Sequence, residues 1–339
     1  MKRAGFVIVT AAIAVLATGC SSPRAKPAPP PPPTGVLRLG FTADLADAPA
    51  LAGLQLGYFA ADLGQVTLDP VPFTSTLAEA QALRRGELDA AYLDPMAAVA
   101  VWQADQDGGL KIVAGTASGG AELVTRPGIT SARQLAHARV AAPAGSAQEV
   151  ALDWWLRQNS VPDTGPGNAT MSAAYLSSAL RSGRLDAAWE PAPLDAEITA
   201  AGGHVLVNEA SLWPSGQFAT AVLVVTTSFL TRHAAAVGLL LRGQVRAEEF
   251  AATDKTGAAA AANREIAVTA GPALPPAVLA QAFAQLEFTN DPLTTTILAE
   301  AQHGAAAGLL NQVTSLDGLF DLQPLNVLLK ASGLRQVTG

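Results

Sequence analysis

The sequence Ala-Leu-Arg-Arg-Gly-Glu-Leu-Asp-Ala-Ala-Tyr at residues 82–92 occurs again, with three changes, as Ala-Leu-Arg-Ser-Gly-Arg-Leu-Asp-Ala-Ala-Trp at residues 179–189. Both copies predict a helix that ends in arginine, a glycine that closes it in the left-handed conformation, and a short strand Leu-Asp-Ala-Ala. In each copy an aromatic residue stands at the carboxyl end of the strand, and the acid and proline that follow can begin the next helix. Solenoids repeat every ~20–50 residues, whereas these copies are 97 residues apart (179 − 82). The repeat therefore predicts two similar lobes.

Short apolar strands alternate with helices over most of the chain, which predicts an α/β fold with a mostly parallel sheet flanked by helices in each lobe. Strand patterns outside the repeat lie at residues 36–41, 66–71, 110–115, 121–125, 139–142, 205–207 and 219–226. The last of these would return the chain to the first lobe. From Phe229 onward the sequence reads as helical, so we expect a helical C-terminal tail on lobe 1. Lobe 1 is predicted to comprise residues 35–117 plus 222–339, and lobe 2 residues 118–221.

Composition excludes several classes of protein. Of the 339 residues 14% are charged, and the formal net charge is −7. There is no basic stripe interleaved with aromatic residues, so we expect no nucleic-acid partner. The four histidines show no metal-ligand spacing, and no phosphate-binding glycine loop or G-x-S-x-G sequence is present. We therefore expect no catalytic residue, no metal and no cofactor.

The N-terminus has the organisation of an export signal. Lys2-Arg3 precedes an apolar run from Phe6 to Ala17, which is too short to span a bilayer unaided. The run ends in Leu-Ala-Thr-Gly-Cys at residues 16–20, which resembles a bacterial lipobox, where signal peptidase cuts before the cysteine and the thiol is lipidated. An ordinary signal peptide with a chance cysteine is the alternative. Cys20 is the only cysteine, so no disulfide can form within one chain.

These features predict how the mature protein is attached. Residues 1–19 are a lipoprotein signal peptide, and residues 20–34 are a stiff, extended, proline-rich tether. A lipid such as palmitate on Cys20 would anchor the folded part to the cell membrane on its extracytoplasmic face, on the periplasmic or cell-wall side. We expect this anchored protein to be a monomer.

The order of several motifs resembles a known family, the substrate-binding lipoproteins of bacterial ABC importers of the nitrate, sulfonate and taurine type, which include binders of thiamine precursors. The motifs that carry the resemblance are Leu-Arg-Leu-Gly-Phe at 37–41, Leu-Gly-Tyr-Phe at 56–59, the repeat segment 83–91, Ile-Thr-Ser-Ala-Arg-Gln-Leu at 129–135, Gly-Ser-Ala at 145–147 and Trp-Glu-Pro at 189–191. The resemblance implies the two-lobed periplasmic-binding-protein type II fold. It also implies an ABC permease as partner and a small polar organic solute, sulfonate- or taurine-like or thiamine-precursor-like, held between the lobes by hinge closure.

In open α/β sheets ligands bind beyond the carboxyl ends of the strands, which selects the candidate binding residues. Gly145 and Ser146 lie where a predicted strand turns into a helix, and free N–H groups there suit an anionic or polar end of a ligand. The alternative is that Ser146 is an ordinary helix N-cap.

The acids and aromatics of the repeat are the next candidates. Glu190 would accept a hydrogen bond from an amine or ring N–H of the ligand, unless it is a solvated surface acid. Asp94 is a weaker candidate, because an N-cap before Pro95 also explains it. Tyr92 and Trp189 would wall the cleft and stack on the ligand, with core packing as the alternative.

Five further residues are candidates by position alone. Phe41, Thr42 and Asp44 follow the first strand and would lie at the rim of the cleft. Ser118 and Gly119 would offer a hydroxyl and a bare amide where the chain crosses between lobes.

Three functions fit these patterns. The first is an extracytoplasmic solute-binding lipoprotein of an ABC importer. The second is an enzyme of the thiamine-precursor-synthase type, since such synthases share the fold of the family that the chain resembles, and turnover of a precursor would reveal it. The third is a ligand-sensing lipoprotein, which the neighbouring genes would distinguish from the first.

Overall fold

The computed structural model describes residues 33–105, 109–162, 171, 173–213 and 215–338. The predicted signal peptide, Cys20 and the tether as far as Pro32 lie outside the described residues. The remainder falls into a single unit, Pro33–Gly339. Among the helices of the described ranges, none has both the length and the apolar character needed to cross a membrane.

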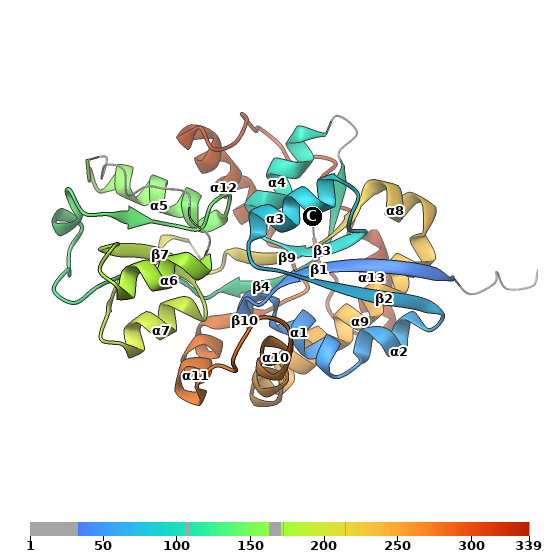
Figure 1. Ribbon diagram of the computed structural model, residues 1–339. Helices are drawn as coiled ribbons and strands as arrows, with labels where there is room; N and C mark the ends of the chain where they lie inside the picture. The colour runs from blue at the N-terminus through green and yellow to red at the C-terminus, as the bar shows by residue number, and fades with distance from the viewer. Residues whose placement is uncertain (1–32, 106–108, 163–170, 172, 214, 339) are drawn as a thin grey trace, which may run out of the picture. The chain divides into compact units, whose positions relative to one another are not determined.

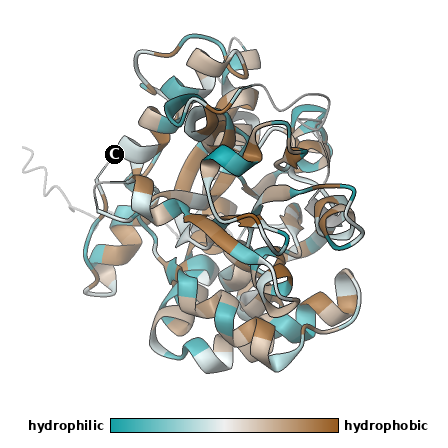
Figure 2. Ribbon diagram, turned by 90° about the vertical axis from the view of Figure 1, so that its left-hand side faces the viewer, coloured by the Kyte–Doolittle hydropathy of each residue, from teal (hydrophilic) through white to brown (hydrophobic). Residues whose placement is uncertain are grey.

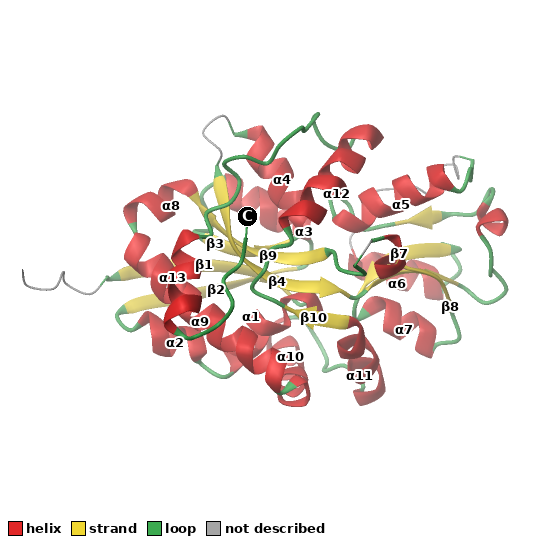
Figure 3. Ribbon diagram, turned by 180° about the vertical axis from the view of Figure 1, so that it is seen from behind, coloured by secondary structure: helices red, strands yellow, loops and turns green. Residues whose placement is uncertain are grey.

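The first sheet is mixed, with strand order β10-β4-β9-β3-β1-β2 (Figure 3). Its strands are β1 (Gly35–Thr42), β2 (Val66–Phe73), β3 (Ala90–Leu93), β4 (Leu110–Gly119), β9 (Ala219–Thr226) and β10 (Leu286–Phe288). β1 runs parallel to β2 and β3, whereas β9 is antiparallel to both β3 and β4. The predicted parallel pairing is therefore present among β1, β2 and β3 and is wrong for the pairs that involve β4, β9 and β10. β4 carries the chain out toward the second sheet and β9 brings it back, so these two neighbours point in opposite directions.

The second sheet has the order β6-β7-β5-β8, and in the sequence its strands fall between β4 and β9 of the first sheet. Its strands are β5 (Ala121–Thr125), β6 (Val140–Ala141), β7 (Ala187–Pro191) and β8 (His204–Asn208). β6 and β7 are parallel, while β5 is antiparallel to β7 and β8. All four strands lie inside the range predicted for lobe 2, whose boundaries remain a prediction.

The first sheet has a core on each of its faces, and alternate residues of β3 enter different cores, as the two-residue period of a strand requires. Leu37, Leu39 and Phe41 of β1 pack on one face, with helices α1 (Ala48–Gln55), α2 (Tyr58–Leu63), α9 (Ala234–Thr253), α10 (Lys255–Thr269), α11 (Pro276–Gln285) and α13 (Gln323–Ala331). Ala91 and Leu93 of β3 pack on the other, with α3 (Thr76–Arg84), α4 (Pro95–Ala104) and α12 (Thr294–Ala307). Figure 1 shows helices on both faces of this sheet.

The second sheet is covered in the same manner. Leu123 and Trp189 face α5 (Ala147–Gln158). Val124 and Ala188, one residue along each strand, face α6 (Ala173–Arg181) and α7 (Leu194–Ala200). The strands are mostly hydrophobic in Figure 2, and the helices carry hydrophobic and hydrophilic bands in turn, which is the pattern of elements that bury one face.

The structure departs from the predicted helices at two places. The apolar segment over residues 48–63, whose pattern predicts a single helix, is two helices, α1 and α2, because Gly57 between them takes a φ of 71°, which only glycine adopts readily. The tail predicted to be helical, which contains α8 (Thr227–Arg232) and α9 to α13, also contributes the strand β10, which adds to the edge of the sheet beside β4.

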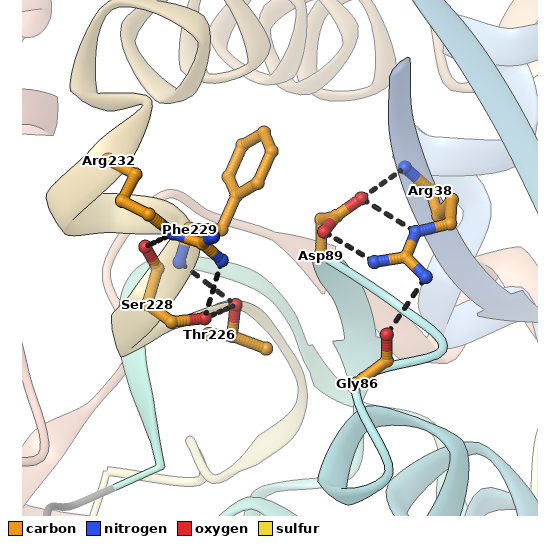
Figure 4. A network of polar contacts seen from close by, with 7 residues as sticks. All are labelled: Arg38, Gly86, Asp89, Thr226, Ser228, Phe229 and Arg232. Atoms are coloured by element: carbon orange, nitrogen blue, oxygen red, sulfur yellow. Dashed lines mark hydrogen bonds and ion pairs between the residues drawn. The ribbon is translucent and has the colours of Figure 1, made fainter. Parts of the chain in front are cut away.

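The first copy of the repeat holds two parallel strands in register (Figure 4). The Asp89 carboxylate accepts hydrogen bonds from the backbone N–H of Arg38 at 3.0 Å, from its Nε at 2.9 Å and from its second guanidinium nitrogen at 2.8 Å. The same guanidinium donates to the carbonyl of Gly86 at 2.8 Å, and Gly86 has the left-handed φ of 71° that the sequence predicted. Asp89 thus fixes β3 against β1.

The second copy repeats this arrangement. Asp186 accepts from the backbone N–H of Arg139 at 2.9 Å and from its Nε at 3.0 Å, and Arg139 donates to the carbonyl of Gly183 at 2.6 Å. Gly183 also has a φ of 71°. The sequence repeat is therefore a structural repeat, which is completed in each copy by an arginine that lies on the paired parallel strand (Arg38 in β1) or directly before it (Arg139 before β6).

Candidate functional site

The carboxyl ends of parallel strands from both sheets meet at one junction. Asp94, which follows β3, accepts the backbone N–H of Ala147, the first residue of α5, at 3.0 Å from Oδ2 and 3.1 Å from Oδ1. Leu45, in the short 3-10 helix η1 (Leu45–Asp47) after β1, donates its N–H to the carbonyl of Ala192 beyond β7 at 3.3 Å. Because ligands of α/β sheets bind beyond such strand ends, this junction is the candidate functional site.

Asp94 caps two helices at once. Its Oδ1 also accepts from the N–H groups of Met96 at 2.8 Å and Ala97 at 3.2 Å, in the first turn of α4. The partial positive charges at the N-termini of α4 and α5 therefore both act on one carboxylate. The N-cap interpretation of Asp94 is confirmed, and the same side chain bridges the two sheets.

Three N–H groups at the N-terminus of α5 have partners within the chain itself. Glu149 accepts the N–H of Gly145 at 2.7 Å, Asp94 accepts that of Ala147, and the Ser146 hydroxyl accepts that of Glu149 at 3.2 Å. Ser146 is the N-cap, is 3% exposed, and donates its hydroxyl proton to the carbonyl of Pro143 at 2.7 Å. An external anion that bound the N–H groups of Gly145 and Ala147 would therefore have to displace carboxylates.

The junction is crowded with carboxyl groups, which we call the acidic cluster. They come from the strand ends, from α5, α7 and α12, and from the 3-10 helix η3 (Glu209–Leu212), and they are Asp44, Asp47, Asp94, Glu122, Glu149, Asp195, Glu209 and Glu300. Their hydrogen-bond donors include backbone N–H groups and the side chains of Thr42, Asn208 and Trp189.

Burial raises the pKa values of these carboxyls because it disfavours the charged form. It raises the pKa of Asp94 to about 6, those of Asp44 and Asp195 to about 7, and that of Glu209 to about 8. The neighbouring charges that raise them further are negative. Asp94 acts on Asp44 and Glu209, and both Glu209 and Asp94 act on Glu300, whose pKa is well above its usual range, first because of burial.

The two aromatics of the repeat lie in separate cores. Tyr92 is 1% exposed, donates its hydroxyl proton to Gln244 at 2.6 Å, and makes an edge contact with Phe59 at 6.4 Å between ring centroids. Trp189 is buried as well, donates Nε1–H to Glu209 at 2.7 Å, and makes an edge contact with Trp155, also at 6.4 Å. They occupy equivalent positions, and Trp189 contacts the acidic cluster through Glu209.

Glu190 points to the opposite face of β7 from Trp189. It is fully buried, pairs across the sheet with Glu122, and accepts the hydroxyl proton of Ser177 in α6 at 2.9 Å. Burial raises the pKa of Glu190 to about 8. The alternative of a solvated surface acid is wrong for this residue.

The candidates at the lobe edges fall into two groups. Asp44 and Thr42 lie at the junction, where Asp44 caps η1 and the Thr42 hydroxyl donates to Asp47 at 3.0 Å, whereas Phe41 is wholly buried in the core of the first sheet. Ser118 and Gly119 belong to the end of β4, which is longer than predicted. The Ser118 hydroxyl accepts the N–H of Phe218 at 3.2 Å.

A small cavity opens beside the acidic cluster, between α5, η3 and α12. Trp154, Trp213, Glu300 and His303 are among its lining residues. α5 and α12 lie side by side (Figures 1 and 3), and the ring of His303 stacks on that of Trp154 with 5.0 Å between centroids.

The sequence analysis did not identify Glu209 and Glu300 as candidates. The signal that could have found them is a single acid in an otherwise apolar turn, as in Leu-Ala-Glu-Ala at 298–301.

The acidic cluster does not have the form of a metal site. Within the described residues, no group of three or more histidine, cysteine, aspartate or glutamate side chains is arranged to hold a metal ion.

Comparison with known proteins gives a family and a fold. The model of the NMT1-like family matches residues 30–267, which is 238 of the 339 residues. No curated protein sequence matches the chain.

Three solved structures illustrate the fold. The chain is similar to the alkanesulfonate-binding protein SsuA from Xanthomonas axonopodis pv. citri bound to MOPS, with 18% identity and a TM-score of 0.71 over 84% of this chain and 96% of that one. It is similar to the periplasmic nitrate-binding protein NrtA from Synechocystis PCC 6803, with 13% identity and a TM-score of 0.75 over 88% and 89%. The desulfurization enzyme DSZB gives 18% identity and a TM-score of 0.62 over 88% and 99%. The predicted α/β fold of the periplasmic binding proteins is thereby confirmed.

Proposed function

The chain belongs to the NMT1-like family, and we propose that it is the extracytoplasmic solute-binding component of an ABC importer. The observation that carries this proposal is the link between Asp94 and Ala147, because it joins the strand ends of two sheets at the place where α/β proteins bind ligands. The binding functions of SsuA and NrtA, which share the fold, support it.

The proposed mechanism is closure of two lobes on the solute. Gly119, the last residue of β4, and Gly120, which connects it to β5, have φ values of 85° and 73°, so the chain can turn there as only glycine readily does. We place the hinge at these residues and at the start of β9, close to the predicted lobe boundaries of 117/118 and 221/222. A solute that touches both lobes only when they are closed shifts the population to that state.

The proposal includes the partners expected from the sequence. A lipid on Cys20 would tether a monomer to the cell membrane on its extracytoplasmic side, and the closed form would deliver the solute to a permease. The solute would be a small polar organic molecule of the sulfonate, taurine or thiamine-precursor kind, held by residues of the junction that include Asp44, Asp94 and Ser146.

Capture fits the junction better than catalysis. DSZB shows that the fold also carries enzymes. Here the partners that the acidic cluster has, such as Thr42, Asn208 and Trp189, orient or stabilise carboxyls and provide no activated nucleophile.

A binding screen tests the proposal. The full chain, purified in detergent, would be heated with sulfonates, taurine, nitrate, pyrimidines and alkylammonium compounds. A true solute at a hundred times its Kd raises the free energy of unfolding by about 2.7 kcal/mol, which a thermal shift detects. If the bound compound is recovered chemically changed, the protein is an enzyme; if no compound shifts the transition, the proposal fails.

A further inference from the structure

We propose that the first sheet and its helices carry a second ligand site, away from the junction, which binds a small primary amine with an apolar body. The site is a groove between the end of α9, the segment that leads from β10 to α12, and the end of the chain after α13. We call it the tail groove. Its ligand is additional to the solute that the junction captures, so this inference goes beyond the proposed function.

The tail groove is large enough for a small organic ligand. It has a volume of about 380 Å³, and small-molecule sites in proteins usually measure ~300–1,000 Å³. None of the described residues that line it belongs to the acidic cluster of the junction. They come from α9, from residues 287–293 and from the chain end, and they include Glu248, Phe288, Asn290, Leu329, Leu334 and Arg335.

Glu248 is the residue that points to a missing partner. It is 3% exposed and lines the groove, and its Oε1 has no hydrogen-bond partner in the described part of the chain. Gln244 can supply no further donor from the core, because its two amide hydrogens are used on Glu248 Oε2 at 3.3 Å and on the carbonyl of Gly115 at 3.2 Å. A buried carboxyl oxygen without a partner is costly, so a donor that enters from the groove is favoured.

Asn290 supplies a second acceptor on the same groove. Its Oδ1 is buried and has no partner among the described residues. The N–H of Gly115 donates to the Asn290 carbonyl at 2.8 Å, and the Gly115 carbonyl accepts from Gln244, which also binds the Glu248 side chain. Gly115 therefore holds both acceptors beside one stretch of the groove. An ammonium group, with three N–H donors and a positive charge, can satisfy both.

The charges and walls of the tail groove select the class of ligand. Four acidic side chains and one basic side chain line its described part, and they are Glu248, Glu249, Glu287, Asp291 and Arg335. Burial raises the pKa of Glu248 well above its usual range, and an ammonium beside it favours the charged form again. The acidic excess attracts a cation more than an anion, and the walls formed by Phe288, Leu329 and Leu334 suit an apolar body.

Calorimetry on the full chain in detergent tests the charge requirement directly, with titration into detergent alone as the blank. The probes are phenethylamine and hexylamine, their uncharged analogues 2-phenylethanol and hexan-1-ol, and the anion 3-phenylpropanoate. We expect at least one of the two amines to bind. Its alcohol and the anion should bind at least about tenfold more weakly, which is the effect of one lost charged hydrogen bond.

Variants locate the site. Glu248→Gln keeps the shape of the side chain and prevents its ionisation, so we expect it to weaken the amine about tenfold or more. Ala252→Phe, at an exposed position of α9 that lines the groove, fills the space and should weaken the amine as well. Glu79→Gln is the matched control and should leave affinity unchanged. Glu79 is fully buried and both of its carboxyl oxygens lack partners in the described ranges, but it does not line the groove.

Each outcome decides one part of the inference. Amine binding that is weakened by both groove variants and kept by Glu79→Gln supports the site. Binding that survives either groove variant, or that is weakened by Glu79→Gln as well, overturns the site. An alcohol or 3-phenylpropanoate that binds as tightly as the amine overturns the ligand class. If neither amine binds, the inference fails as a whole, while solute capture at the junction is unaffected.

Discussion

Asp94, which follows a strand of the first sheet, accepts the N–H of Ala147, which begins a helix packed on the second sheet, at 3.0 Å. The same carboxylate accepts the N–H of Met96 at the N-terminus of α4 at 2.8 Å. A single carboxyl therefore stabilises two helices and the junction between them.

Asp94→Ala should lower the free energy of unfolding more than the loss of an ordinary cap. A helix N-cap contributes about 0.5–2 kcal/mol, and Asp94 serves two helices, so we expect a loss near the sum of two such contributions in urea unfolding. Ser75→Ala is the control, since Ser75 caps only α3 by accepting from Ala78 at 3.1 Å. Equal losses for the two variants would show that the contact with Ala147 contributes nothing.

The acidic cluster predicts that stability falls as pH rises. The pKa values of Asp94, Asp44 and Glu209 are raised to about 6, 7 and 8, whereas in the unfolded chain such groups have values near ~4. Between about pH 4 and pH 8 the folded state then binds more protons than the unfolded state, so the free energy of unfolding decreases with pH.

Urea unfolding of the chain between pH 4.5 and pH 8.5 checks this slope. Glu209→Gln should reduce it, because the variant removes one of the titrating groups. Asp186, whose pKa is lowered chiefly by its hydrogen bond with Arg139, acts in the opposite sense but only below its unfolded value, outside this window. Stability that rises with pH would contradict a buried, proton-rich cluster.

Both copies of the repeat should lose stability on mutation, and the second copy should lose at least as much as the first. Asp89→Asn and Asp186→Asn each remove one carboxylate that binds an arginine and its backbone N–H, and Asp186 also pairs with Arg126 at 2.6 Å. The arginines are partly exposed, so we expect each variant to lose roughly 1–2 kcal/mol of unfolding free energy. Glu87→Gln removes an exposed pair and should change little. A loss in one copy alone, or a smaller loss in the second copy, would contradict this expectation.

The proposed anchor predicts where the protein is found in cells. Cys20→Ser removes the only thiol that can carry a lipid. In a bacterial host the unchanged chain should incorporate labelled palmitate and sediment with membranes, and the variant should do neither. Membrane association of the unlipidated variant would mean that the N-terminal segment anchors the protein by another route.

The repeat, the α/β class and most strands could be predicted from sequence because they depend on local patterns. The left-handed glycines are an example, since Gly86 and Gly183 follow helices that end in arginine. Their arginine partners could not be found in this way. Arg38 is 51 residues from Asp89, and Arg139 is 47 from Asp186, and only the pairing of the strands brings them together.

The candidate site was harder to predict because the sequence of a fully apolar strand does not indicate which of its two faces points toward a core and which toward a ligand. The sequence placed Tyr92 and Trp189 at matching strand ends, and both are there, but which face looks into a core depends on helices that are distant in sequence. Glu300 lies in the tail, where the apolar pattern of α12 gives no sign that its acid meets Asp94 and Glu209.

The two aspartate–arginine pairs, Asp89 with Arg38 and Asp186 with Arg139, limit how the sequence of this chain can evolve. A substitution at Asp89 or Asp186 leaves the arginine on the neighbouring segment without its carboxylate partner. The tolerated replacements are therefore those in which the aspartate and its arginine change together. Each half carries its own pair of such positions, and the two pairs can drift independently of one another. Sequences of relatives should therefore show Arg38 linked to Asp89 and Arg139 linked to Asp186, with no correlation between the two couples.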